Sequence, residues 1–177
     1  STVALSTPCV VLPERANLDV SVRPLRHEVE FAAAIEGQVE NREVAFDRDR
    51  YLDFCQRQMT LYRRMIAGAV DSSGSNCSLA VDSSGSNCSL GRGLWWGAFA
   101  GEELVGSLGI FCSQGVARYQ VVTTHRQHQR QGICARLVYE AGRHALEQLG
   151  VHTLTMAAEA DSPAARIYQS VGFGARE

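Results

Sequence analysis

Hydrophobic positions in the first half of the chain recur with two different periods. Residues 18–25 (LDVSVRPL) alternate between apolar and polar side chains, which predicts a strand with one buried face. Residues 27–40 predict a helix with a face of small residues at 32–34. Residues 47–68 repeat apolar side chains at helical spacing, which predicts a longer helix, capped by Asp47 and ending at Gly68. Residues 1–17 show neither period, so we expect an irregular arm there, with a short strand at residues 10–12 as the alternative.

The second half of the chain predicts a hairpin, two further strands and two helices. The expected strands are 94–100, 104–111, 116–124 and 152–158, and the expected helices are 132–149 and a short one from Pro163, capped by Ser162, to Gly172. Strands thus alternate with helices. This order predicts an α/β (α+β layered) fold in which helices pack on a mixed sheet.

An identical tandem repeat interrupts this pattern. AVDSSGSNCSL occurs at 69–79 and again at 80–90. Solenoid repeats are longer and need several copies, so this segment does not indicate a repeat architecture. Its Ser, Gly and Asn content predicts a low-complexity, duplicated loop that folding does not require.

Composition excludes several classes of protein. The 177 residues are 45% hydrophobic and 20% charged, with a formal net charge of -2, which suits a single domain over 1–177. No apolar run is long enough to cross a membrane, and the charge is not that of a nucleic-acid-binding protein. All 17 basic residues are Arg, which excludes lysine Schiff-base chemistry and suggests a GC-rich bacterial genome.

The cysteines indicate a reducing compartment. Six are scattered along the chain without a C-x-x-C pair, so we expect free thiols, a cytoplasmic protein and no metal site. Residues 1–12 lack the basic and apolar regions of a signal peptide.

Residues 121–134 (VVTTHRQHQRQGIC) carry the first chemical signal. A strand runs into a polar loop, and Gly132 then opens an amphipathic helix. Unpaired N–H groups at such a helix start bind anions, and glycine allows close approach of a phosphate. The residues alone therefore predict a phosphate-sized anion site around 129–135, although a plain strand-to-helix turn has the same pattern.

A second stretch, residues 160–173 (ADSPAARIYQSVGF), makes the pattern more specific. Gln129 to Cys134 fits the motif [QR]-x-x-G-x-[GA] except at Cys134, and Asp161 to Tyr168 with Gly172-Phe173 fits N-x-P-A-x-x-[LI]-Y-x-x-x-G-F with Asp161 in the Asn position. Over residues 94–173 the chain resembles the Gcn5-related N-acetyltransferase (GNAT) superfamily. The resemblance implies a mixed, mostly antiparallel central sheet flanked by helices.

The resemblance also implies a co-substrate and its site. In this family acetyl-CoA is the acyl donor, and its pantetheine arm pairs with a strand backbone that corresponds here to Val122, Thr123 and Thr124. Its pyrophosphate lies on the amides of a loop that corresponds to Gln129, Arg130, Gln131, Gly132, Ile133 and Cys134. Asp161, from the second motif, is assigned to the cofactor site as well.

Tyr168 is the candidate catalytic residue. A phenol near the reacting thioester can protonate the departing CoA thiolate, whereas a packing role for the ring is the alternative. No general base is assigned: Glu159, Asp161, His125 and His128 lie near the expected cleft, and a water chain beside Gln120 is another route. Direct transfer in the family makes Cys134 an improbable acyl carrier.

The implied function is N-acetyl transfer from acetyl-CoA to an amine of a small molecule or peptide. A catalytically silent module that binds acyl-CoA as a sensor or scaffold is the alternative. Family members usually continue past the Gly-Phe pair into a final strand, whereas only 174–177 follow here. We therefore expect the N-terminal arm, or a partner subunit in a homodimer, to cover the open sheet edge.

Overall fold

The computed structural model describes residues 1–42, 47–67 and 92–175, and the duplicated segment 69–90 lies outside them. The elements are β1 (Thr2–Thr7), β2 (Ser21–Pro24), α1 (Glu28–Glu40), α2 (Arg48–Ala67), β3 (Arg92–Ala100), β4 (Glu103–Ser113), β5 (Val116–Thr124), a 3₁₀ turn (Arg126–His128), α3 (Ile133–Gln148), β6 (Thr153–Glu159), α4 (Pro163–Ser170) and β7 (Gly174–Ala175). The four helices and the strands from β2 to β6 confirm the sequence-based predictions. Their boundaries differ from the predicted ones by a few residues.

Seven strands form one mixed sheet in the order β2-β3-β4-β5-β6-β1-β7. Only β5 and β6 run parallel, and every other pair is antiparallel. The crossover from β5 to β6 is made by α3, as a parallel connection requires. The predicted α/β fold, with a mostly antiparallel sheet between helices, is confirmed.

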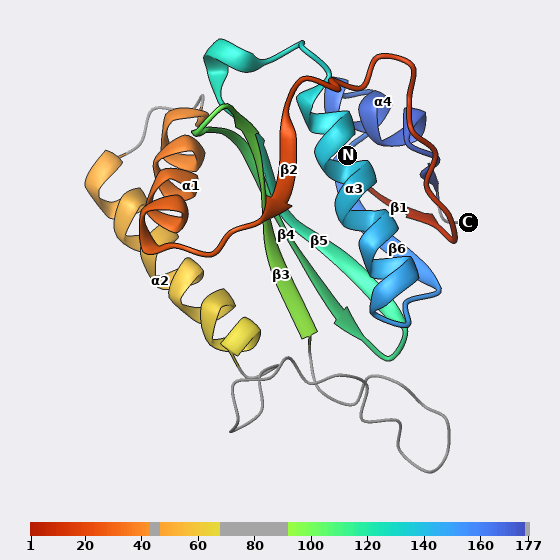
Figure 1. Ribbon diagram of the computed structural model, residues 1–177, viewed down its shortest axis with the longest axis horizontal. Helices are drawn as coiled ribbons and strands as arrows, with labels where there is room; N and C mark the ends of the chain where they lie inside the picture. Colours follow the sequence, from red (N-terminus) through yellow and green to blue (C-terminus); the bar gives the residue numbers. More distant parts are fainter. Residues whose placement is uncertain (43–46, 68–91, 176–177) are drawn as a thin grey trace.

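Helices cover both faces of the sheet (Figure 1). On one face α1 and α2 pack through Phe31, Ala34 and Met59 onto alternate residues of β3 and β4. On the other face the apolar side of α3, including Leu137 and Ala141, packs with α4 onto the intervening residues. The strands therefore carry apolar side chains on both faces, as expected of a sheet covered on both sides.

Local signals in the sequence account for the helix ends. The Asp47 carboxylate accepts hydrogen bonds from the N–H groups of Asp49 and Arg50, both at 3.1 Å, and so caps α2. The Ser162 hydroxyl caps α4 by accepting from the N–H of Ala165 at 3.1 Å. Both caps were predicted from the residue type before the apolar run.

The N-terminal arm contains a strand that its sequence did not indicate. Instead of an irregular segment, Thr2–Thr7 forms β1, which pairs with β6 along its whole length and with β7 at Leu5 and Ser6. Val3, Leu5 and Thr7 turn inward while Thr2 and Ala4 are exposed, but Leu5 is the one large apolar side chain of the strand that is fully buried, so the pattern is too short to predict a strand. The expectation that the arm covers the open edge of the sheet is confirmed.

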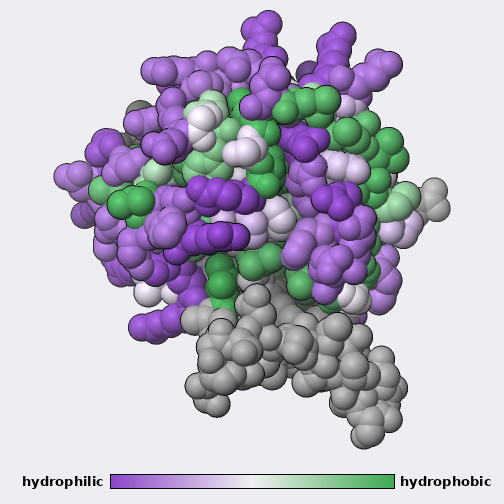
Figure 2. Space-filling view, viewed as in Figure 1, coloured by the Kyte–Doolittle hydropathy of each residue, from purple (hydrophilic) through white to green (hydrophobic). Residues whose placement is uncertain are grey.

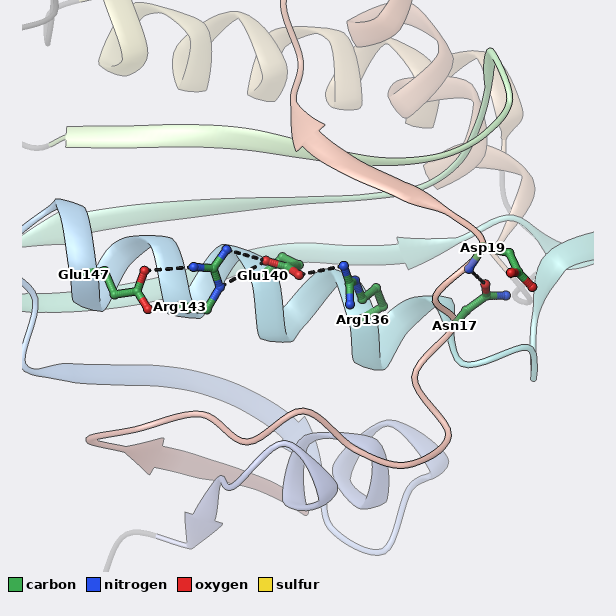
Figure 3. A network of polar contacts seen from close by, with 6 residues as sticks. All are labelled: Asn17, Asp19, Arg136, Glu140, Arg143 and Glu147. Atoms are coloured by element: carbon green, nitrogen blue, oxygen red, sulfur yellow. Dashed lines mark hydrogen bonds and ion pairs between the residues drawn. The ribbon is translucent and has the colours of Figure 1, made fainter.

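Residues 8–20, here called the crossing segment, join strands on opposite sides of the sheet. β1 lies beyond β6, whereas β2 lies at the far edge beside β3. Figures 1 and 3 show the crossing segment passing α4 and the first turn of α3 before it enters β2. Val11 and Leu12 on this segment are 58% and 40% exposed, and Figure 2 shows apolar surface on the α4 side of the molecule.

Charged residues form ion pairs along one side of α3. Arg136, Glu140, Arg143 and Glu147 form a ladder at three- and four-residue spacing, with N–O distances from 2.8 to 3.0 Å (Figure 3). The ladder runs from the more exposed pair of Arg143 and Glu147, which contributes a few tenths of a kcal/mol, to the more buried pair of Arg136 and Glu140.

Candidate functional site

The edge of β5 opens where the strand leaves β6. The two strands pair only from Val116 to Arg118, opposite residues 153–155 of β6. Beyond this point β6 continues to pair with β1 on its other side, while β5 pairs only with β4. The backbone of β5 from residue 119 to 124 therefore faces a gap in the sheet on one side, where an extended ligand could pair with it.

A bulge in β5 lies at the same place. Ser107 faces Thr123 and Gly109 faces Gln120, so one more residue is present on β5 than on β4 between these pairs. Within the bulge Val121 has φ +46°, a conformation that β-branched residues rarely adopt. Bulges and strained residues are common at functional sites because they turn a strand away from its neighbour.

The loop after β5 ends at a helix start with free donors. Gly132 is the N-cap of α3 with φ +76°, and no side chain caps the helix. Among the described residues, none accepts a hydrogen bond from the backbone N–H of Ile133, Cys134 or Ala135. These three N–H groups and the helix dipole lie where the sequence analysis expects an anion to bind.

A cavity of about 1070 Å³ connects these features. Residues from β5, the following loop, the start of α3 and α4 line it. They are Val122, Thr123, Thr124, His128, Gln129, Arg130, Gln131, Gly132, Ile133, Cys134, Ala135, Pro163, Ala164, Arg166, Ile167, Tyr168 and Ser170, together with Pro13, Arg15 and Asn41. Both sequence motifs thus meet at one cavity.

The charge of this lining is positive. Arg15, Arg130 and Arg166 line the cavity with His128, and the lining residues include no carboxylate. Among the described residues neither Arg15 nor Arg130 forms an ion pair, and Arg166 donates to the carbonyl oxygen of Asp161 at 3.2 Å. An anionic ligand therefore meets uncompensated guanidinium groups here.

Tyr168 is buried on α4, and its hydroxyl has no hydrogen-bond partner among the described residues. The side chain is 6% exposed and belongs to the core beside α3, yet no described residue hydrogen-bonds to its hydroxyl. Burial, with a smaller contribution from the neighbouring Cys134 thiol, raises the pKa of Tyr168 well above its ordinary value. The phenol is therefore protonated at neutral pH and able to donate.

Cys134 lies in the first turn of α3, next to Tyr168. Burial raises the pKa of its thiol to about 12. The thiol is thus protonated at neutral pH and is a poor nucleophile, because the thiolate is the reactive form.

Three residues that the sequence analysis named for the site or its proton transfer do not line the cavity. Asp161 is exposed in the turn before α4 and does not line the cavity. Glu159 is exposed at the end of β6 and does not line it either. Gln120 accepts a hydrogen bond from Tyr62 of α2 at 3.5 Å, on the side of the sheet covered by α1 and α2.

A second cavity, of about 630 Å³, adjoins the first through His128. His125 and His128 line it with Glu103, and the Nε2 of His128 lies 3.7 Å from the Glu103 carboxylate. Glu36 and Glu40 of α1 line its other side. The histidines named as base candidates therefore lie at this second cavity, and only His128 reaches both.

Three lining residues were missed by the sequence analysis. Pro13 and Arg15 come from the crossing segment, which had no pattern to mark it. Asn41 follows α1, and its Nδ2 donates to the carbonyl oxygen of Thr124 at 2.6 Å. This bond ties the end of α1 to the end of β5, and only the three-dimensional arrangement shows it.

Neither a membrane span nor a metal site is visible in the described part of the chain. No helix there is long and apolar enough to cross a bilayer. No three His, Cys, Asp or Glu side chains of those residues gather as metal ligands. The described cysteines, Cys9, Cys55, Cys112 and Cys134, are free thiols.

Comparison with known proteins confirms the resemblance. Residues 91–174 match the family described as the acetyltransferase (GNAT) domain. This range contains both motifs and all elements from β3 to α4. Among curated proteins, none matches the sequence significantly.

Solved structures share the fold at low sequence identity. A GCN5-related N-acetyltransferase from Sphaerobacter thermophilus is 15% identical with a TM-score of 0.62, over 99% of this chain and 48% of its own. A tandem GNAT protein of the clavulanic acid biosynthesis pathway is 13% identical with a TM-score of 0.59, over 98% and 50%. A transcriptional regulator from Bacillus halodurans is 21% identical with a TM-score of 0.59, over 89% and 95%. The chain thus spans about half the length of the first two proteins.

Proposed function

We propose that this chain, whose residues 91–174 form a GNAT acetyltransferase domain, transfers the acetyl group of acetyl-CoA directly to an amine. One observation carries the proposal. The open backbone edge of β5, the free N–H groups of α3 and the unpaired hydroxyl of Tyr168 all face one positively charged cavity.

The cavity suits the chemistry of acetyl-CoA from end to end. The pantetheine arm carries amide groups, which can pair as an added strand does with the backbone of β5 at Val122 to Thr124, on the side that β6 leaves open. The Thr124 carbonyl oxygen already accepts from Asn41, so this pairing uses the other backbone groups of the segment. The pyrophosphate can accept from the N–H groups of residues 133–135 at the start of α3. We assign Gln129 to Cys134 to this phosphate site, as in the sequence analysis.

Tyr168 is placed to act as the general acid. Acetyl-CoA supplies an activated thioester, whose transfer to an amine forms a C–N bond and releases CoA as a thiolate. The Tyr168 phenol remains protonated at neutral pH and has no hydrogen-bond partner among the described residues, so its proton is available to the sulfur.

The acceptor is an amine of a small molecule or a peptide, in the cytoplasm of a bacterial cell. Its ammonium form must lose a proton before attack. We assign no single base, because His125 lines the second cavity and not the first, whereas His128, which lines both, lies 3.7 Å from the Glu103 carboxylate. A homodimer also stays a prediction.

Measuring thiol release from acetyl-CoA against a panel of small and peptide amines, beside calorimetric binding of acetyl-CoA, tests the proposal. We expect binding and amine-dependent turnover. Binding without turnover on any amine supports the silent acyl-CoA module, and absence of binding rejects both readings.

A further inference from the structure

The crossing segment is fastened on both sides of the large cavity. On the α4 side, the N–H of Val11 donates to the carbonyl oxygen of Val171 at 2.9 Å. On the α3 side, the N–H and the Nδ2 of Asn17 donate to the carbonyl oxygens of Gly132 at 3.2 Å and Gln131 at 3.0 Å. The segment therefore bridges the two helices whose residues hold the two motifs.

Between these attachments the segment contributes to the cavity wall. Ala16 donates to the carbonyl oxygen of Pro13 at 3.0 Å, which closes a turn with Glu14 and Arg15 at its centre. Pro13 and Arg15 line the cavity, whereas Glu14 does not. The turn thus brings the Arg15 backbone against Gly132 at the start of α3 and places Arg15 in the cavity wall, with no carboxylate partner for its guanidinium among the described residues.

Asn17 fixes this arrangement. Its Oδ1 accepts from the N–H of Asp19 at 2.9 Å, which forms the tight turn that leads into β2 (Figure 3). The position of Arg15 is therefore set by backbone hydrogen bonds two residues away, and a change of the Arg15 side chain leaves these bonds intact.

We propose that Arg15 is a phosphate-binding residue of the acetyl-CoA site and that the crossing segment closes over the nucleotide end of the bound molecule. The inference rests on the proposed function for the identity of the ligand. Acetyl-CoA carries a pyrophosphate and a 3′-phosphate, and the α3 amides can satisfy only part of this charge. A guanidinium group forms forked hydrogen bonds with a phosphate, and Arg15 is one of the three arginines that line the cavity.

Binding calorimetry of Arg15→Ala tests this role. We expect a loss of about tenfold in affinity for acetyl-CoA, with less loss at high salt. Arg15→Lys, which keeps the charge but not the fork, restores part of the affinity. Arg64→Ala removes an exposed arginine of α2 that lines neither cavity, and it leaves the affinity unchanged.

Titration with 3′-dephospho-CoA identifies the phosphate. If Arg15→Ala no longer weakens binding of this compound, Arg15 holds the 3′-phosphate, whereas an undiminished loss assigns it to the pyrophosphate. Limited trypsin digestion of the unmodified chain provides a second measurement. Acetyl-CoA slows cleavage after Arg15 if the segment closes over it.

The two proposals fail in different ways. An unmodified chain that does not bind acetyl-CoA overturns the proposed function and the role of Arg15 with it. An unmodified chain that binds acetyl-CoA, with Arg15→Ala binding equally well and no protection from trypsin, overturns the role of Arg15 alone.

Discussion

The carbonyl oxygen of Arg15 lies against Gly132, where a methyl group on that glycine would overlap it. Gly132 also has φ +76°, which glycine adopts at little cost and other residues do not. One position thus meets two requirements: it starts α3 with free N–H groups, and it leaves room for the crossing segment.

Gly132→Ala should therefore lower the free energy of unfolding by more than the cost of the left-handed backbone conformation alone. The left-handed conformation costs an alanine about 1–2 kcal/mol, and overlap with the crossing segment adds about 1–3 kcal/mol. We expect urea unfolding to show the combined loss and calorimetry to show weaker acetyl-CoA binding.

Gly101→Ala is the matched control. Gly101 has φ +62°, and nothing lies within 4 Å of an added methyl group. Its free energy of unfolding should fall only by the conformational cost of about 1–2 kcal/mol. Equal losses in the two variants would show that the crossing segment moves aside without cost.

Tyr168→Phe should impair turnover without weakening the fold. The variant keeps the ring and removes a hydroxyl that has no partner among the described residues, so the free energy of unfolding should stay within about 1 kcal/mol. Loss of a general acid typically lowers kcat by about 10²- to 10⁴-fold. Because water can partly replace the phenol, we expect kcat of Tyr168→Phe to fall by at least about tenfold. The Kd for acetyl-CoA should change little.

Tyr119→Phe should show the opposite result, with a loss of stability and an unchanged kcat. The Tyr119 hydroxyl donates to the carbonyl oxygen of Val138 at 2.7 Å in the core. Its removal leaves that bond unmade and should cost about 1–2 kcal/mol of stability while kcat is retained. Unchanged kcat in Tyr168→Phe would reduce Tyr168 to a packing residue.

Glu30 makes the free energy of unfolding depend on pH in the acidic range. Its carboxylate accepts from Arg23 at 2.6 Å and from the N–H groups of Arg26 and His27, and these bonds, with Arg23 the strongest, lower its pKa to about 2 despite its burial. The folded chain therefore holds the ionised form more firmly than the unfolded chain. This stabilisation is present above pH 4.5 and is lost as the pH falls toward 2.

Glu30→Gln should cost about 1–3 kcal/mol at pH 7, and its deficit should shrink as the pH falls from 4.5 toward 2. Unfolding by urea at a series of pH values measures both effects. Glu28→Gln, two residues away with a 75% exposed side chain, should cost less than about 1 kcal/mol. A deficit of Glu30→Gln that is independent of pH would contradict this account.

Cys134 should react slowly with alkylating reagents. With a pKa of about 12, a fraction on the order of 10⁻⁴ is thiolate at pH 8, whereas Cys9 is exposed. Mass spectrometry after iodoacetamide treatment should find Cys9 modified well before Cys134. Cys134→Ala should keep kcat and acetyl-CoA affinity within about threefold, and a loss of turnover would instead support a role for the thiol in transfer.

Most of the fold was predictable from local patterns. Helices such as Arg48–Ala67 and Ile133–Gln148 carry long apolar periods and clear end signals, at Asp47 and Gly132. The two motifs also meet at one cavity, which Gly132 and Tyr168 both line, whereas the roles of these residues stay predictions.

The features that escaped prediction depend on contacts between distant residues. The strand Thr2–Thr7 is held by its pairing with β6 and not by its own sequence. The positive φ of Val121 arises from the bulge between β4 and β5, and its residue type would predict an ordinary strand position. Arg15 reaches the cavity only because Asn17 binds Gly132, which no local pattern reveals.

The pairing of Thr2 with Glu159 also has a kinetic consequence. β1 cannot complete its pairing until β6 has been made, and β2 to β5 lie between these two strands in the sequence. Contacts of such long sequence separation form slowly because the intervening chain must first be ordered. We therefore expect the sheet from β2 to β5 to assemble first and β1 to dock late, so that the unpaired edge of β6 is the surface most open to aggregation during folding.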